Sequence, residues 1–237
     1  MPRTIGLHPE DRYTFRTNES FRQEWNFLPD NEKKAIIATQ LTYLAFHGWL
    51  KSNLRHATQE VPEPHQWSEL VFDVDEGFHR TDLLLFASIC EAALNCVLRA
   101  IYDKDAVNAH PTLKRCYERA EDVTVTLNGS EFQLVGANVP TTGKLCLRRS
   151  SQVPVNETEI KFISLISAGE ELGIYDHALR ERLDILRSDR NSIHLAQHLR
   201  INNQEGAFTR ADRDAAAQIV EDFRIALGAY LNANPVA

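Results

Sequence analysis

The stretch TDLLLFASICEAALNCVLRAIY, residues 81–102, decides the fold class. Apolar side chains occupy most positions around its helical circumference, so we expect a helix that is covered on several sides. Its polar residues Glu91 and Asn95 are four positions apart and therefore lie on one face. A central helix of this kind needs other helices packed around it, which predicts an all-α helical bundle.

The segments on both sides of this helix have helical periodicity and capping signals. Pro29 is expected to end a short helix, Asp30 to cap the next one, and Thr209 to open the last one with a capping box. Gly173 is expected to end a helical unit. The expected helices cover residues 18–28, 31–54, 81–102, 112–121, 157–169, 176–195 and 209–232.

One segment interrupts the helical pattern. Residues 123–127 alternate as VTVTL, Asn128-Gly129 follows, and residues 131–135 read EFQLV. Asn-Gly between alternating segments is a strong signal for a tight hairpin turn. KLCLR at 144–148 is expected to form a third short strand or an extended arm. We therefore predict a small β-hairpin insertion over about residues 123–148.

The prolines suggest how the chain is divided. Pro62 and Pro64 lie within residues 57–75, which we interpret as a linker or loop. On this basis residues 1–75 form an N-terminal helical extension with its linker. Residues 76–237 form the main helical domain, which contains the β insertion.

Composition excludes several classes of protein. The formal net charge is −7, which argues against a protein that coats duplex DNA by bulk electrostatics. None of the four cysteines, Cys90, Cys96, Cys116 and Cys146, form a CxxC pair, so we expect reduced thiols and no metal site or cofactor. The N-terminus has no apolar signal region, and the longest apolar run, residues 83–90, is far short of the ~20 residues that span a bilayer. We expect no membrane association and a cytoplasmic location.

The segment most suggestive of chemistry is LRERLDILRSDRNSIHLAQHLR, residues 179–200. In one continuous helix, Arg187, Arg190 and His194 occupy positions i, i+3 and i+7 and share one stripe. Arginine and histidine at this spacing are also common on solvated helix faces, where they form surface ion pairs. Spacing alone therefore leaves a structural role open.

This combination of side chains suits the cleavage of RNA. The attacking 2′-hydroxyl must lose a proton and the leaving 5′-oxygen must gain one, and an imidazole that titrates near neutral pH can do either. A guanidinium offers a planar, permanently charged fork for phosphate oxygens and stabilises the added negative charge of the transition state. Such a reaction needs no metal.

The same residues resemble the signature of the HEPN superfamily, an arginine followed by four to six residues and a histidine, usually with a polar residue after the arginine. Arg187 and His194 match with six intervening residues, and Ser188 is the polar follower. Arg190-Asn191 looks like the common Arg-Asn form, but only three residues separate it from His194. The resemblance therefore assigns the catalytic role first to Arg187 and His194, with Arg190 and Asn191 in support. Which of the two arginines binds the phosphate stays open.

The resemblance covers about residues 81–231, apart from the β insertion. It implies a HEPN-type bundle, a metal-independent endoribonuclease that acts on RNA, and a homodimer in which two motifs line one cleft. It also implies that Glu91, on the family's first long helix, faces the motif. Many members of the family are toxins or antiviral effectors.

Two other functions stay open. The chain is alternatively a non-catalytic interaction or regulatory module, such as a partner in a defence or toxin–antitoxin pair. A third alternative is a structural bundle in which Arg187 and His194 only hold a dimer together. If the protein is an enzyme, we expect His194 and the arginines to be accessible in a cleft. If it is an interaction module, we expect this cluster to be covered or paired with acids such as Glu91.

Overall fold

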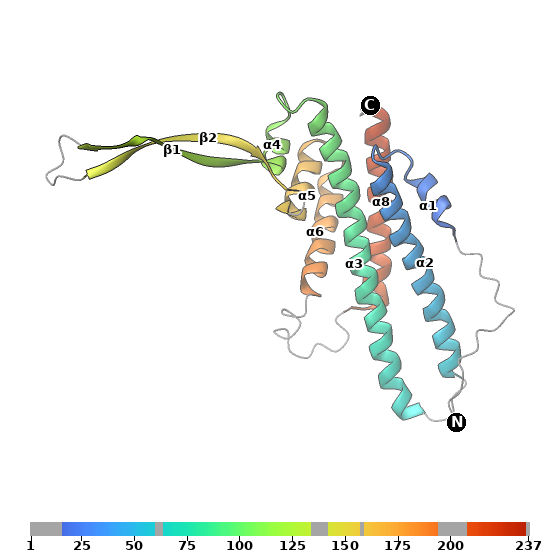
Figure 1. Cartoon of the computed structure of the whole chain (residues 1–237). Helices are drawn as coiled ribbons and strands as arrows, with labels where there is room; N and C mark the ends of the chain where they lie inside the picture. The colour runs from blue at the N-terminus through green and yellow to red at the C-terminus, as the bar shows by residue number, and fades with distance from the viewer. Residues whose placement is uncertain (1–15, 60–63, 134–141, 157–158, 194–207, 236–237) are drawn as a thin grey trace.

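Helix α3 (Pro64–Lys104) is the central element of the protein, and the other long helices pack along it (Figure 1). The computed structural model describes residues 16–59, 64–133, 142–156, 159–193 and 208–235, and within them the side chains outside 52–76 and 120–152. The remaining helices are α1 (Asn18–Glu24), α2 (Asn31–Gln59), α4 (Pro111–Tyr117), α5 (Phe162–Glu171), α6 (His177–Ser192) and α8 (Arg210–Ala233). The predicted all-α class is confirmed.

The core lies where α3 meets α2, α5, α6 and α8. Fully buried side chains come from each of these helices, among them Ile37, Leu83, Ile89, Leu94, Leu98, Leu165, Ile166, Leu183 and Phe223. Burying such a side chain contributes about 1.5–3 kcal/mol relative to leaving it exposed. This burial explains why residues 81–102 are apolar on most faces.

Several helix ends lie where the sequence places them, since they depend on neighbours within one turn. The carboxylate of Asp30 accepts hydrogen bonds from the backbone N–H groups of Glu32 (2.7 Å) and Lys33 (3.2 Å). Thr209 and Asp212 form the complete capping box at the start of α8. Gly173 follows α5 with φ of 70°, the left-handed conformation that glycine adopts without strain.

The predicted linker at residues 57–75 is wrong. Helix α2 continues to Gln59, and α3 already begins at Pro64, so most of that segment is helical. Proline is well tolerated in the first turn of a helix, where its missing N–H would have no intrahelical partner. Pro64 thus starts the helix that it was expected to exclude. The expected division between residues 75 and 76 falls within α3.

The β insertion is a two-stranded antiparallel hairpin, β1 (Glu118–Gln133) and β2 (Thr142–Pro154), which projects away from the bundle (Figure 1). The hairpin is confirmed, but the predicted turn at Asn128-Gly129 is wrong. These residues lie inside β1, where the pairing register shifts between Thr126 and Glu131. Asn-Gly occupies an irregularity within the strand, a position that also suits residues with permissive backbone angles.

Part of α3, residues 77–104, is long and apolar enough to cross a membrane when judged by length and composition alone. Half of its most apolar window is buried inside the protein. The central helix of a helical bundle can have the same composition, because its apolar side chains are covered by neighbouring helices and not by lipid. Its apolar character is accounted for by the packing of α3 against α2, α5, α6 and α8.

Candidate functional site

The contact between Arg190 and Glu91 joins α6 to the central helix. A guanidinium nitrogen of Arg190 lies 2.5 Å from a carboxylate oxygen of Glu91. Leu183 and Leu186 are buried on the face of α6 that meets α3, and Arg190 continues this row by one further turn. The two side chains remain 29% and 27% exposed, so this ion pair is open to solvent and to ligands.

A pocket of about 440 Å³ lies beside this ion pair. Both members of the pair line it, and so do polar and apolar residues from α2, α3, α5 and the segment before α5: Lys33, Ser88, Ala92, Asn95, Ile160 and Leu165. Ligand pockets of this size combine apolar walls with a few polar groups that set orientation. The sequence predicted that Glu91 and Asn95 share a face, and the pocket confirms it.

Asn95 is held in place from behind the pocket. The hydroxyl of Tyr117, a fully buried residue, donates to the side-chain oxygen of Asn95 at 3.0 Å and lies 3.2 Å from its backbone carbonyl. The amide is therefore fixed by a hydrogen bond to the core. A fixed polar group loses little conformational entropy when a ligand binds.

The two arginines of the motif have different surroundings. Nε of Arg187 donates to Asp184 on its own helix at 2.6 Å, and Arg187 is not among the residues that line the pocket. Ser188 and Asn191 are exposed on α6. Of the described motif residues, Arg190 is the one that the fold brings to the pocket together with Glu91.

The predicted helix over 176–195 is too long at its C-terminal end. Helix α6 ends at Ser192, with Ile193 as its C-cap, and the side chain of Asp176 caps its start by accepting from the N–H of Leu179 at 2.9 Å. His194 lies outside the described residues. The shared stripe of Arg187, Arg190 and His194 therefore stays a prediction.

Burial affects one titratable group at the end of α6. It raises the pKa of the Asp189 carboxyl, and the carboxylate of Asp212 at the start of α8 raises it further. Arg182, two turns earlier on α6, donates to Asp222 of α8 at 2.6 Å, which lowers the pKa of Asp222. The surface between α6 and α8 thus mixes one favourable ion pair with one unfavourable acidic pair.

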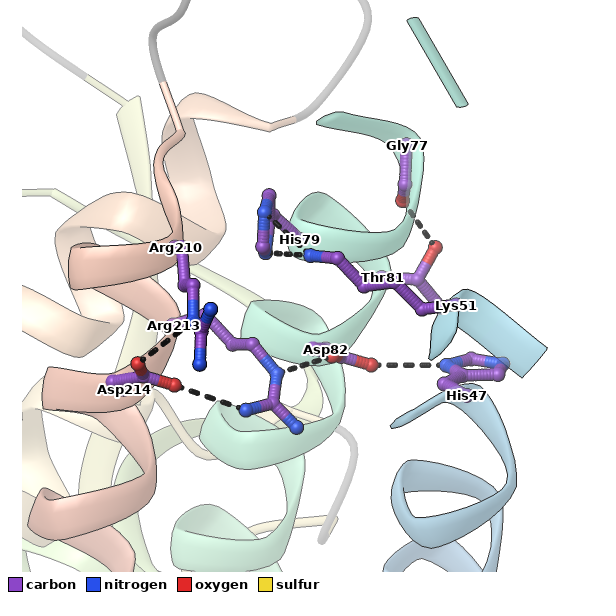
Figure 2. Close-up of polar contacts among 9 residues, drawn as sticks. All are labelled: His47, Lys51, Gly77, His79, Thr81, Asp82, Arg210, Arg213 and Asp214. Carbon is purple, nitrogen blue, oxygen red and sulfur yellow. Dashed lines mark hydrogen bonds and ion pairs between the residues drawn. The ribbon is translucent and has the colours of Figure 1, made fainter. Parts of the chain in front are cut away.

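A second polar cluster was not predicted from the sequence (Figure 2). Asp82 of α3, with a side chain only 2% exposed, accepts from Nε of Arg213 at 2.8 Å and lies 2.9 Å from Nδ1 of His47. Nζ of Lys51 lies 2.7 Å from Nε2 of His79 nearby. His79 is buried as well.

No sequence signal identifies this cluster. Asp82 is 35 positions from His47 and 131 positions from Arg213, and the three residues come from three different helices. A buried carboxylate requires partners of opposite charge or hydrogen-bond donors, and here one cation and one imidazole provide them. The cluster joins α2, α3 and α8.

Within the described parts of the chain, no three His, Cys, Asp or Glu side chains come together in a way that could hold a metal ion. Comparison of the chain with protein-family models, curated proteins and solved structures finds no match.

Proposed function

We propose that this protein is a metal-independent endoribonuclease with a HEPN-type bundle, and that the pocket beside Arg190 binds the RNA strand at the cleavage site. The observation that supports this proposal is the position of Arg190. It is the motif arginine that lines a pocket, and Glu91, the acid expected to face the motif, contacts it there.

In this proposal Arg190 binds the phosphate that is attacked. Its guanidinium donates to the non-bridging oxygens and stabilises the extra charge of the transition state. Glu91 is a positioning residue that keeps the Arg190 guanidinium at the pocket. When RNA binds, an N–H group of Arg190 that donates to Glu91 donates to the phosphate instead. Lys33, which also lines the pocket, supplies a second positive charge.

His194 is the proposed general acid or base. It follows Arg190 by four positions and has the one side-chain type in the motif that titrates near neutral pH. The imidazole moves the proton and the guanidinium stabilises charge, so the reaction requires no metal ion. We further propose that the enzyme acts in the cytoplasm as a homodimer, in a defence or toxin–antitoxin system.

A non-catalytic interaction module is the second candidate, and one observation favours it. Both motif arginines are engaged by acids, Arg187 by Asp184 and Arg190 by Glu91. Ion pairs of this kind also occur where arginine has a purely structural role. The two candidates make opposite predictions for RNA cleavage.

The test is RNA degradation by the purified full-length protein, with His194→Ala and Arg190→Ala as variants. Arg224→Ala is the matched control, because Arg224 is likewise held by an acid, Glu221, but lies on α8 away from the pocket. The proposal expects cleavage by wild type and by Arg224→Ala, its loss in the other two variants, and no effect of EDTA. Unchanged cleavage by His194→Ala, or no cleavage by wild type, rejects it.

A further inference from the structure

Tyr117 fixes which end of the Asn95 amide is available to a ligand. The buried Tyr117 hydroxyl donates to the amide oxygen of Asn95 at 3.0 Å, so this oxygen is engaged from the core side. In the described part of the chain, no hydrogen bond engages the amide nitrogen. Because Asn95 lines the pocket beside Arg190, the N–H groups of its amide are what it offers to a ligand there.

The other polar side chains of the pocket also favour a ligand that accepts hydrogen bonds. Lys33 and Arg190 carry donors only. Glu91 is the one carboxylate among the described lining residues, and Arg190 engages it at 2.5 Å. The hydroxyl of Ser88 can donate as well as accept. Donors therefore outnumber acceptors around the pocket.

Apolar side chains give the same pocket a wall for the face of a base. Ala92 of α3, Ile160 before α5 and Leu165 of α5 line it. Its volume of about 440 Å³ lies at the small end of the range for ligand pockets. A planar base packs its apolar faces against such a wall and turns its polar edge towards fixed polar groups. The pocket therefore suits a single nucleotide.

The position of Asn95 relative to Arg190 matches the parts of a nucleotide. Asn95 lies one helical turn beyond Glu91, which contacts Arg190. Side chains four positions apart on a helix have Cβ atoms about 5–6 Å apart. In a nucleotide, one ribose separates the phosphate from the base, so a phosphate at Arg190 leaves the base within reach of Asn95. This step rests on the proposed function, which assigns the phosphate to Arg190.

We propose that Asn95 selects guanine as the base beside the phosphate that is cleaved. Guanine presents two neighbouring acceptors, O6 and N7, on one edge, whereas adenine presents N7 beside an amino donor. The Asn95 amide donates to O6 of guanine. Against adenine two donors face each other, because Tyr117 engages the amide oxygen that could have accepted. The pyrimidines lack the N7 acceptor.

The first measurement is the binding of two nucleotides of the same size to the full-length protein by titration calorimetry. Inosine 3′-monophosphate keeps the O6 and N7 acceptors of guanine, and adenosine 3′-monophosphate replaces O6 by an amino group. We expect the inosine nucleotide to bind at least about fivefold more tightly. Guanosine 3′-monophosphate should bind like inosine. Equal binding, tighter binding of adenosine, guanosine as weak as adenosine, or no binding at all overturns the proposal.

Asn95→Asp tests the role of the amide N–H groups. A carboxylate still accepts from Tyr117 but has no N–H to donate, so we expect the preference for inosine to be lost. The ratio of the two dissociation constants is the readout, because the added charge weakens the binding of both phosphates. Asn232→Asp is the matched control, since Asn232 is exposed on α8 and does not line the pocket. An unchanged ratio in Asn95→Asp overturns the proposal.

Tyr117→Phe tests whether the amide must be fixed. Without the hydroxyl the Asn95 amide can turn and offer either end, so we expect the two nucleotides to bind about equally while binding itself is kept. Tyr102→Phe is the control, because the Tyr102 hydroxyl donates to Glu118 at 2.8 Å and not to Asn95. A ratio as large as that of wild type in Tyr117→Phe contradicts the proposed selection.

These titrations need no cleavage, so they separate base selection from the ribonuclease proposal. A protein that prefers inosine but does not degrade RNA rejects the ribonuclease and keeps the selection of the base. A protein that degrades RNA but binds the two nucleotides equally keeps the ribonuclease and rejects the selection.

Discussion

Arg190 contacts Glu91 across 99 positions of the chain and thereby joins the end of α6 to the middle of α3. The same contact forms part of the wall of the pocket. Arg187, only three positions from Arg190, is engaged within its own helix instead. This difference between two neighbouring arginines is the basis of the first prediction.

The two motif arginines should differ in their effect on cleavage. Arg190→Ala is expected to lower kcat by about 100-fold or more, the usual loss when one donor to a developing negative charge is removed. Arg187→Ala should lower kcat by less than about tenfold, because Arg187 does not line the pocket. Steady-state kinetics on one RNA substrate separates kcat from KM. A larger loss in Arg187→Ala would assign the phosphate to Arg187.

The buried carboxylate of Asp82 should matter for stability. Asp82→Ala leaves Arg213 and His47 without their shared partner, and breaking a buried pair of this kind costs about 3 kcal/mol or more. Asp184→Ala is the control, because it breaks an ion pair that is about one third exposed, with an expected cost of at most about 1 kcal/mol. Urea unfolding gives both free energies. Equal losses would mean that the Asp82 cluster is no more than a surface contact.

Asp189 should lower the stability of the folded protein at neutral pH. Its pKa is raised by burial and by Asp212, and an acid with a higher pKa in the folded than in the unfolded chain destabilises the fold wherever it is ionised. We expect Asp189→Asn to be more stable than wild type at neutral pH. The difference should disappear as pH falls through the folded pKa, and should be absent near about pH 3, where the carboxyl is protonated in both states.

Urea unfolding of wild type and Asp189→Asn at neutral and acidic pH checks this pattern. Asp189 accepts from the backbone N–H of Ile193 and the hydroxyl of Ser192 through its own backbone carbonyl, so the substitution keeps these contacts. An equal or lower stability of Asp189→Asn at neutral pH contradicts the assigned repulsion.

Two glycines should respond in opposite ways to alanine. A Cβ at Gly169 in α5 would collide with the ring of Tyr175, whose hydroxyl donates to the carbonyl of Ile166 at 2.9 Å. Gly169→Ala is therefore expected to cost about 1–3 kcal/mol through overpacking, despite the better helix propensity of alanine. Gly77→Ala in α3 meets nothing within 4 Å and should stabilise the protein by about 0.5–1 kcal/mol. Thermal unfolding of both variants distinguishes the two effects.

The capping signals at three helix ends were reliable. Asp30, Gly173 and Thr209 act on backbone groups within one turn, so their roles at helix ends depend little on the rest of the fold. Local reasoning failed at Pro64 and at Asn128-Gly129. A proline is compatible with both a loop and the first turn of a helix. Asn-Gly is compatible with both a tight turn and an irregular strand. Local sequence alone therefore does not decide between the two conformations at either position.

The candidate site was predictable in part. Glu91 and Asn95 share a helix face by spacing alone, and the resemblance to HEPN proteins drew attention to the arginines. Lys33 and Ile160 in the pocket wall, and the partners of Asp82, have no signal in the sequence. They come from segments far apart in the chain, and only packing decides which of many possible faces meet.

The sequence by itself determined the all-α class, the apolar part of the central helix and several helix ends, since periodicity and caps involve residues within a few positions of one another. The tertiary structure alone decided that Arg190 meets Glu91 and that His47 and Arg213 share Asp82. The physical reason is that a helix specifies its own face, whereas its rotation and partner depend on how all the apolar faces are buried together.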